Sequence, residues 1–309
     1  MQNHTELNQQ FGIKDQLQFS QGDNGFVMID ISNQYAKARI STYAGQIVSY
    51  QPHDESEDLF FLSDKVIYQE GKAIRGGVPI CWPWFGDDTS GFERPPHGFV
   101  RNQQWHILST EVLEDGRTSV SLVTTDSDMT RELWHYEFNL ELQFIIGPEL
   151  ELSLKTKNTG KQFFTITQAL HTYFKVSDVS NVLIKGLDGK PYIDKLDSFA
   201  IKQQTDDITV SQEIDRIYQK APKEVSLSDS GFNRTITIAS YGSDTTVVWN
   251  PWATSSSNMA DLSEESYRNF VCVETANVFT DSLTIIPAGR EHVVTTVFSI
   301  SKFGVNGLG

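Results

Sequence analysis

A strict two-residue alternation is the sequence feature that most constrains the fold of this chain. From position 138 to position 146 an apolar residue stands at every even position, with Asn139, Glu141 and Gln143 between them. Successive side chains of a β-strand point to opposite faces, so this segment predicts a strand with one buried face. After the Gly147-Pro148 turn the alternation resumes with leucines at 150, 152 and 154, which predicts an antiparallel hairpin.

The same pattern occupies most of the chain. It predicts further strands at 26–31, 36–41, 45–50, 118–125, 163–174, 234–241, 245–250 and 292–300, and a short helix only at 261–267. Many strands separated by Gly, Asn, Asp and Pro turns are typical of an all-β antiparallel sandwich or barrel. Because no repeat or linker interrupts the pattern, we expect a single domain at 25–303. An N-terminal extension or edge segment at 1–24 and a short tail at 304–309 flank it.

Composition excludes several classes of protein. The 309 residues are 39% hydrophobic, which is too apolar for a disordered chain, and the net charge is −15 with a pI near 4.8. Such a surface repels both nucleic acid and an anionic membrane, so we expect neither as a partner. We expect a monomer that binds a small molecule.

Two cysteines and the N-terminus indicate the compartment. Cys81 and Cys272 are far apart in the sequence and form no C-x-x-C pair, which fits a reducing cytoplasm. The first residues lack the basic start and apolar run of a secretory signal. No stretch reaches 18 uncharged apolar residues, so no membrane span is expected.

The segment 71–105 differs from the rest of the chain. It holds three of the six tryptophans and four of the ten prolines, and its four basic residues outnumber its three acidic ones. The remaining chain therefore carries all of the negative excess. A long aromatic loop of this kind is typical of a ligand mouth on a β scaffold. It is equally typical of a packed loop that covers a sheet edge.

Two residues stand out as candidates for acid–base chemistry. His171 has the parity of the more polar face of its predicted strand, where a surface histidine is the ordinary alternative. Glu274 ends the run Phe270–Glu274, which is apolar at both parities and therefore predicts burial on both faces. A buried carboxylate is costly unless it is paired or functional. Its alternative is a strand-end carboxylate that caps a loop or pairs with an arginine.

Other polar residues carry weaker signals. Asp215 lies in a short alternating strand, where an exposed carboxylate is the default. Arg75, before Gly76-Gly77, and Arg101, four residues after His97, stand where guanidinium groups could converge on an oxyanion. Ordinary surface arginines, or arginines packed on tryptophans, are the alternative. A zinc site of His97, His106 and His171 has no supporting ligand spacing.

Five stretches together resemble a known family. They are IRGGVPICWPWFG at 74–86, PHGFVR at 96–101, QALH at 168–171, EIDRIY at 213–218 and FVCVETA at 270–276. In this order they resemble the glucose-6-phosphate 1-epimerase branch of the aldose 1-epimerase family, over roughly residues 25 to 300. The first and second stretches are specific to this branch. Val100, where alanine is common, is a small departure.

The resemblance implies a galactose-mutarotase-like β-sandwich and an isomerase that needs no cofactor and no metal. It implies that His171 is the general acid and Glu274 the general base that interconvert the α and β anomers of a hexose 6-phosphate. It further implies that Asp215 and His97 contact the sugar and that Arg75 and Arg101 hold the phosphate.

Three alternatives remain at the level of the sequence. The first is a mutarotase for unphosphorylated aldoses, which would not need the two arginines. The second is a glycoside hydrolase, which would need a second carboxylate opposite Glu274, and no clear candidate is present. The third is a non-catalytic sugar-binding sandwich, which would not need the acid–base pair.

Overall fold

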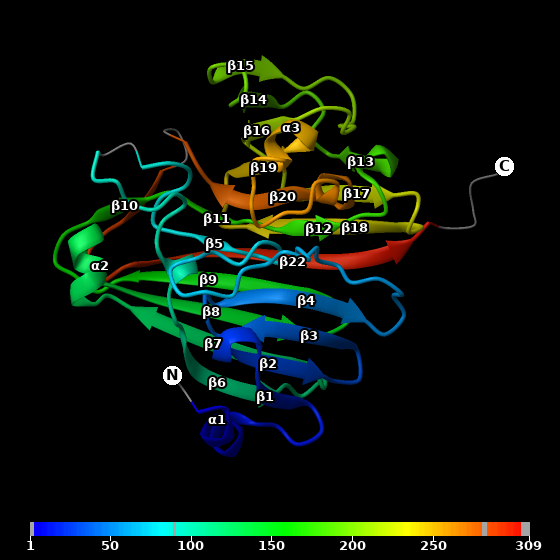
Figure 1. Cartoon of the computed structure of the whole chain (residues 1–309). Coiled ribbons are helices and arrows are strands. Elements are labelled where there is room, and N and C mark those ends of the chain that lie inside the picture. The colour runs from blue at the N-terminus through cyan, green and yellow to red at the C-terminus, as the bar shows by residue number, and fades with distance from the viewer. Residues whose placement is uncertain (1–2, 89–90, 280–282, 304–309) are drawn as a thin grey trace.

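Strands form two packed layers in the computed structural model, which describes residues 3–88, 91–279 and 283–303 (Figure 1). One layer is a continuous eight-stranded sheet, here called the back sheet. The other layer consists of a second eight-stranded sheet, the front sheet, and a four-stranded N-terminal sheet below it in Figure 1. All pairings in these sheets are antiparallel, so the predicted all-β antiparallel sandwich is confirmed.

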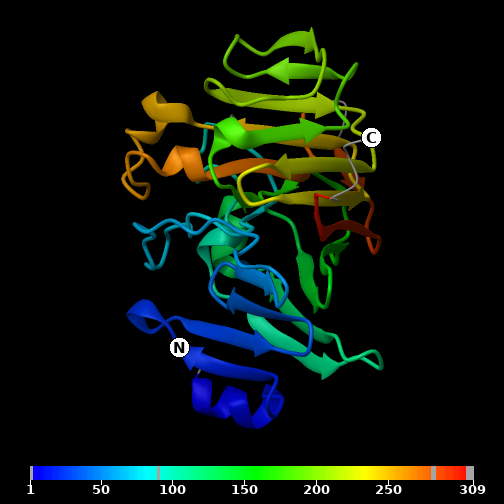
Figure 2. The same cartoon turned by 90° about the vertical axis from the view of Figure 1, so that its right-hand side faces the viewer.

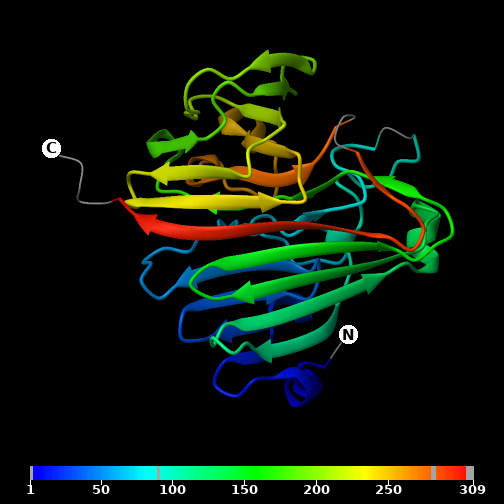
Figure 3. The ribbon, with the colours of Figure 1, turned by 180° about the vertical axis from the view of Figure 1, so that it is seen from behind.

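The back sheet faces the viewer when the molecule is turned by 180° (Figure 3). Its strands, in spatial order, are β13 (Val182–Lys185), β17 (Glu224–Asp229), β18 (Arg234–Tyr241), β22 (Glu291–Lys302), β9 (Leu150–Asn158), β8 (Phe138–Ile146), β7 (Thr118–Thr125) and β6 (His106–Val112). The predicted hairpin of β8 and β9 is present. The five even-numbered side chains of β8 are at most 1% exposed, as the alternation predicts.

The front sheet carries the candidate site. Its strands, in spatial order, are β15 (Ala200–Gln203), β14 (Pro191–Asp194), β16 (Ile214–Gln219), β19 (Thr245–Asn250), β20 (Phe270–Asn277), β11 (Gln168–Leu170) and β5 (Ile80–Cys81), with β12 (Tyr173–Lys175) also paired to β20. Every residue of β20 is buried, which confirms the expectation drawn from its apolar run. β20 continues to Asn277, so Glu274 lies inside the strand rather than at its end.

The N-terminal sheet consists of β1 (Leu17–Gln21), β2 (Val27–Ser32), β3 (Ala36–Ser41) and β4 (Gln46–Pro52) in sequence order. β1 is an edge strand paired to β2, and helix α1 (His4–Phe11) precedes it. Seen from the side, this sheet lies at the opposite end of the molecule from the β14–β15 hairpin (Figure 2). The proposed domain limits stay a prediction, and residues 1–2 and the predicted tail at 304–309 lie outside the described residues.

The remaining elements are short. They are the paired strands β10 (Phe164–Ile166) and β21 (Thr284–Ile286), the helices α2 (Asp128–Leu133) and α3 (Trp252–Ser256), and the 3₁₀ turns η1 (Asp23–Gly25), η2 (Val100–Asn102), η3 (Val179–Asn181) and η4 (Ser266–Asn269). Within the described ranges, no helix has the length and apolar character needed to cross a bilayer.

Two expectations about single elements are wrong. The predicted strand 163–174 is divided into β10, β11 and β12. The backbone N–H groups of Thr167 and His171 bond to the carbonyls of Pro83 and Pro79 in the register of β11 and β5, but a proline has no N–H to return the second bond of each pair. The predicted helix at 261–267 is a series of turns that ends in η4. Side-chain bonds from Arg75 to Asp261 and from Ser263 to Asp64 hold this segment in its non-helical path.

The layers meet through a continuous apolar core. Phe298 of β22 packs edge-on against Phe60 and Phe174, with ring centroids 5.8 Å and 5.3 Å away. Tyr50 of β4 donates a hydrogen bond to the carbonyl of Gly147 between β8 and β9. The rigid back sheet thus supports the front sheet from behind.

Candidate active site

Strand register places His171 opposite Glu274. Leu170 pairs with Thr275 and Tyr173 pairs with Cys272, so the register is the same on both sides of the break between β11 and β12. The two unpaired positions between them therefore oppose Glu274 and Val273. Residues directly opposite each other on antiparallel strands have Cβ atoms about 5 Å apart.

The same register builds two parallel rows across one face of the front sheet. One row contains His171, Glu274, Val247 and Ile217, and the adjacent row contains Tyr173, Cys272, Trp249 and Asp215. Side chains two residues apart on a strand share a face. One histidine and two carboxylates, with aromatic and thiol neighbours, therefore gather on one surface although they come from different strands.

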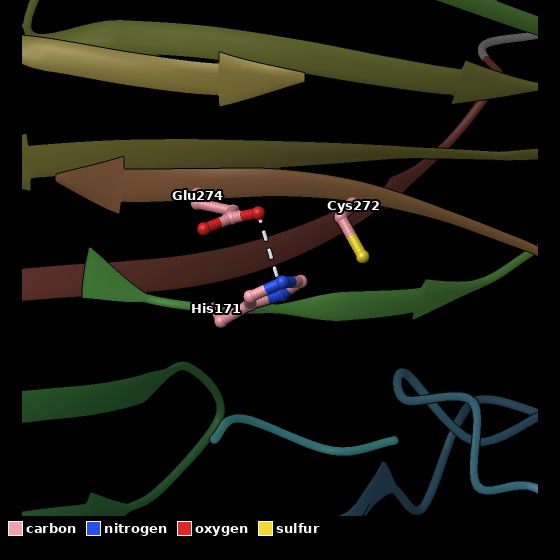
Figure 4. Close-up of side chains that lie close together, drawn as sticks. All are labelled: His171, Cys272 and Glu274. Atoms are coloured by element: carbon pink, nitrogen blue, oxygen red, sulfur yellow. Dashed lines mark ion pairs between the residues drawn. The ribbon is translucent and has the colours of Figure 1, made fainter. Parts of the chain in front are cut away.

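His171 and Glu274 point toward each other (Figure 4). His171 Nδ1 lies 3.3 Å from Glu274 Oε1. The His171 residue is 7% exposed and the Glu274 residue 1% exposed, so the surface histidine and the loop-capping carboxylate are both ruled out. The ion-pair partner of Glu274 is this histidine rather than an arginine.

Burial shifts the pKa values of the two groups in opposite directions. Desolvation raises the pKa of Glu274 well above its ordinary value, and the nearby charge of Asp215 adds to the rise. Desolvation lowers the pKa of His171 well below its ordinary value, and His97 and Arg101 add to the decrease. Such opposed shifts of a buried acid and base are typical of groups that exchange protons with a ligand.

Aromatic rings fix the imidazole of His171. The ring of Tyr173 stacks on it with centroids 4.9 Å apart and an interplanar angle of 11°. The rings of His97 and Trp249 contact it edge-on at 5.7 Å and 5.8 Å. Its orientation is therefore determined before any ligand arrives.

A tight turn brings His97 to the site. His97 and Gly98 both have positive φ, and a Cβ on Gly98 would lie 1.8 Å from the carbonyl oxygen of Trp82, so only glycine fits there. The backbone N–H of His97 bonds to the Gly86 carbonyl, and the Gly86 N–H bonds to His97 Nδ1. Burial lowers the pKa of His97 well below its ordinary value, which favours the neutral imidazole.

The two predicted arginines differ in how their charge is compensated. Arg75 donates from Nε to Asp261 at 3.0 Å and from Nη1 to the Tyr173 hydroxyl at 2.8 Å. Arg101 donates from Nη2 to the carbonyl of Pro96 at 2.9 Å, and its buried Nε has no partner among the described residues. No carboxylate in the described ranges forms an ion pair with Arg101. The arginine stacked on a tryptophan is Arg94, over Trp84.

Asp215 is a partly buried carboxylate, contrary to the exposed default. Its side chain is 14% exposed and its Oδ2 lies 2.6 Å from Lys195 Nζ. Desolvation raises its pKa, and Lys195 opposes that rise. Lys195 follows β14 and lies opposite Asp215, to which its backbone N–H also bonds.

One cavity of about 270 Å³ contains all six residues singled out from the sequence. Its lining consists of Arg75, Phe85, Asp87, Pro96, His97, Arg101, His171, Lys195, Asp215, Val247, Trp249, Met259 and Glu274. Segment 71–105 supplies six of the thirteen. Trp82 and Trp105 of the same segment are completely buried, and β5 forms the edge of the front sheet, so the segment both lines the cavity and covers the sheet edge.

Other hollows lack this chemistry. The groove of about 520 Å³ over β1 to β4 contains the Asp30–Arg39 ion pair but no buried acid–base pair. A hollow of about 550 Å³ shares Phe85, Asp87, His97 and Lys195 with the site and is otherwise mostly apolar. The smaller cavity around His171 is the candidate active site because its residues can move protons and bind an anion.

The zinc set considered from the sequence is not assembled. His106 lies on the exposed face of β6 in the back sheet, while His97 and His171 line the cavity. A different group brings metal-ligand atoms together: one atom each of His171, Cys272 and Glu274, all within 4.8 Å of one another.

Sequence reasoning missed Lys195, Trp249, Tyr173 and Asp261. Lys195 follows a strand in a segment rich in charged residues, and Asp261 lies in a segment expected to be helical, so neither had a distinguishing pattern. Trp249 and Tyr173 are signalled only by their parity with Val247 and His171, which becomes informative once the strand pairing is known.

Comparisons with known proteins agree with this geometry. The model of the aldose 1-epimerase family matches residues 27–299. The chain is 36% identical to the "Putative glucose-6-phosphate 1-epimerase" of Cenchrus ciliaris, over 78% of this chain and 75% of that protein. It is 35% identical to the Escherichia coli protein of the same name, over 81% and 82%. The crystal structure of a putative mutarotase from Salmonella typhimurium superposes with a TM-score of 0.87 at 30% identity, over 95% of this chain and 96% of that one. The chain belongs to the aldose 1-epimerase family of isomerases.

Proposed function

We propose that this enzyme interconverts the α and β anomers of hexose 6-phosphates, with glucose 6-phosphate as the first substrate to test. One observation carries the proposal: a single cavity holds both a buried His–Glu pair and two arginines, one of which lacks a carboxylate partner among the described residues. The pair suits proton transfer at a sugar ring, and the arginines suit a phosphate. Four named relatives, two of which are described above, carry glucose-6-phosphate 1-epimerase in their names.

Ring opening moves one proton through the substrate. Glu274 takes the proton of the C1 hydroxyl, the C1–O5 bond breaks as the C1 carbonyl forms, and His171 gives its proton to O5. The pair thus passes from carboxylate and imidazolium to carboxylic acid and neutral imidazole. Rotation about C1–C2 exposes the other face of the aldehyde, and the same transfers in reverse close the ring to the other anomer.

The pKa shifts suit this cycle. A carboxylate and an imidazole in water strongly favour the ionised pair, because their ordinary pKa values are about 4.3 and 6.5. Burial raises the pKa of Glu274 and lowers that of His171, and both shifts oppose this bias. The two protonation states that begin and end ring opening are therefore brought closer in free energy, and each proton transfer contributes on the order of 10²–10⁴-fold.

Charge compensation supports an anionic substrate. Among the cations that line the cavity, Arg75 is paired with Asp261 and Lys195 with Asp215. Arg101 is the cation left for a ligand, and a planar guanidinium binds a phosphate through two parallel hydrogen bonds. His97 and Asp215 line the same cavity, which supports a role in contacting sugar hydroxyls: the Asp215 carboxylate can accept a hydrogen bond, and the neutral imidazole of His97 can donate or accept one.

The alternatives make different demands on the site. A glycosidase needs a second carboxylate across the sugar from Glu274. Asp215 does not meet this demand, because it lies on the same face of the front sheet as Glu274 and is paired with Lys195. A purely sugar-binding protein would gain nothing from burying an ionisable pair, which costs stability. A mutarotase for neutral aldoses shares the pair and is distinguished by the role of Arg101.

Anomer-resolved NMR exchange on glucose 6-phosphate, glucose and galactose tests the proposal. We expect enzyme-dependent exchange between the α and β C1 signals of glucose 6-phosphate, with a higher kcat/KM than for either neutral sugar. Catalysis of the neutral sugars alone would show that unphosphorylated aldoses are the substrates. Absence of catalysis with all three sugars would refute the proposed activity.

A further inference from the structure

We propose that His171, Cys272 and Glu274 form a binding site for a thiophilic divalent cation such as Zn²⁺, and that its occupation inhibits the enzyme. The three residues lie on two neighbouring strands of the front sheet. Cys272 and Glu274 are two residues apart on β20 and share a face, and the register places His171 opposite Glu274 (Figure 4). The inhibition rests on the proposed function, whereas the binding does not.

The spacing of the ligand atoms suits a tetrahedral ion. A tetrahedron with metal–ligand bonds of about 2.1 Å has edges of roughly 3.4 Å. The edge between His171 Nδ1 and Glu274 Oε1 is 3.3 Å, and all three ligand atoms lie within 4.8 Å of one another. Because aromatic rings fix the imidazole of His171, the remaining gap would close by rotation of the Cys272 and Glu274 side chains toward it.

Two of the ligand groups carry a buried polar atom without a hydrogen-bond partner. Neither His171 Nδ1 nor Glu274 Oε2 has a hydrogen-bond partner among the described residues, although His171 is 7% and Glu274 1% exposed. Buried polar atoms without a partner are costly. A bound cation would supply the missing interaction to both groups at once.

Cys272 makes the site selective. Its thiol is fully buried beside Tyr173, Phe270 and Phe61, and it does not line the cavity. Nitrogen, sulfur and carboxylate ligands together favour Zn²⁺ or Co²⁺, whereas Mg²⁺ prefers oxygen ligands only. The ion would displace the thiol proton, as metal binding by cysteine requires.

Occupation would stop the reaction. His171 and Glu274 line the cavity, so a cation entering through it would take the lone pairs that the proton transfers use. Three protein ligands leave a fourth position for water or a substrate hydroxyl. Inhibition is therefore expected to compete with the sugar.

The test compares the wild type with Cys272→Ser, using Cys81→Ser as the matched control. Cys81 is the other fully buried thiol of the chain, on β5, and lies outside the group. Calorimetric titration with Zn²⁺ measures binding, Co²⁺ titration reports a thiolate-to-cobalt charge-transfer band, and anomer exchange with and without Zn²⁺ measures inhibition. Cys272→Ala provides a second variant in case the serine variant does not fold.

We expect one Zn²⁺ per chain in the wild type and in Cys81→Ser, with a cobalt–thiolate band and inhibition that a chelator reverses. Loss of an outer-shell partner costs 10–100-fold in metal affinity, so loss of the thiol ligand should cost about 100-fold or more and remove the band. The uninhibited rate of the Cys272 variants should remain, and Mg²⁺ should not inhibit. Unchanged Zn²⁺ affinity in both Cys272 variants, or no binding by the wild type, would overturn the proposal. If the wild type catalyses no anomer exchange, the titrations still decide on the metal site.

Discussion

His171 lies in the break between β11 and β12 and faces Glu274 of β20. The distance between His171 Nδ1 and Glu274 Oε1 is 3.3 Å. We expect Glu274→Gln and His171→Ala each to lower kcat/KM by at least about 10²-fold, because each removes one partner of the proton transfers. Anomer-resolved NMR measures the rate and circular dichroism checks the fold. A rate close to that of the wild type in either folded variant would contradict the assigned mechanism.

The buried carboxylate should also cost stability. The pKa of Glu274 is raised in the folded state, so protonation of this carboxylate favours folding. Its stabilising contribution is complete below the pKa of the unfolded state and is lost as the pH rises through the pKa of the folded state. Glu274→Gln should therefore be inactive yet more stable than the wild type at neutral pH, by about 1 kcal/mol. The difference should shrink below about pH 4, under the unfolded pKa of a glutamate. Thermal unfolding at both pH values measures this, and a less stable variant at neutral pH would show that the pair stabilises the fold.

We expect a bell-shaped dependence of kcat/KM on pH. Both active states of the pair hold one proton, so activity falls at low pH when a second proton binds and at high pH when the single proton is lost. Burial raises the pKa of Glu274 and lowers that of His171. The two apparent pKa values of the profile therefore describe the coupled pair rather than either residue alone. The measurement is kcat/KM for glucose, whose lack of a phosphate removes the titration of the substrate. A profile with one inflection would indicate that a single group limits the reaction.

Arg101 should distinguish phosphorylated from neutral sugars. A hydrogen bond to a charged group contributes about 1.5–3 kcal/mol, so Arg101→Ala should raise KM for glucose 6-phosphate by roughly 10–100-fold and change that for glucose little. Arg75→Ala should have a smaller effect on KM, because Arg75 is already paired with Asp261.

Arg94→Ala is the matched control for the arginine variants. Arg94 lies in the same segment but pairs with Asp88 and stacks on Trp84, and it does not line the cavity. It should leave both KM values unchanged. Equal effects of Arg101→Ala on KM for the two sugars would show that Arg101 does not recognise the phosphate.

Lys195 should act by holding Asp215. Its Nζ lies 2.6 Å from Asp215 Oδ2, and without it the raised pKa of Asp215 would rise further. Lys195→Met should therefore increase KM for both glucose 6-phosphate and glucose, more strongly at low pH. The control is Lys202→Met, since Lys202 pairs with Asp194 and Asp197 on the same hairpin outside the cavity. Identical KM values for wild type and Lys195→Met would show that the pair is only structural.

The two-residue alternation was sufficient to predict most strands, because one-sided burial leaves a period that survives in the sequence. The segment 163–174 was misread as one strand because its parity is continuous, whereas the breaks depend on its pairing with Pro79 and Pro83 of a distant segment, which have no N–H to donate. Lys195 and Asp261 were missed for the same reason. Their roles depend on which strands and loops become neighbours, and local pattern does not encode that pairing.

The break at His171 connects the part of the cavity that contains Arg75 with the His171–Glu274 pair. The backbone N–H of His171 bonds to the Pro79 carbonyl and that of Tyr173 to the Gly77 carbonyl, in the loop that begins at Arg75. Arg75 also bonds to the Tyr173 hydroxyl, and Tyr173 stacks on His171. If a phosphate binds beside Arg75 as proposed, part of its binding free energy can therefore align the imidazole. The phosphate would then raise kcat, so kcat for glucose would be lower than kcat for glucose 6-phosphate.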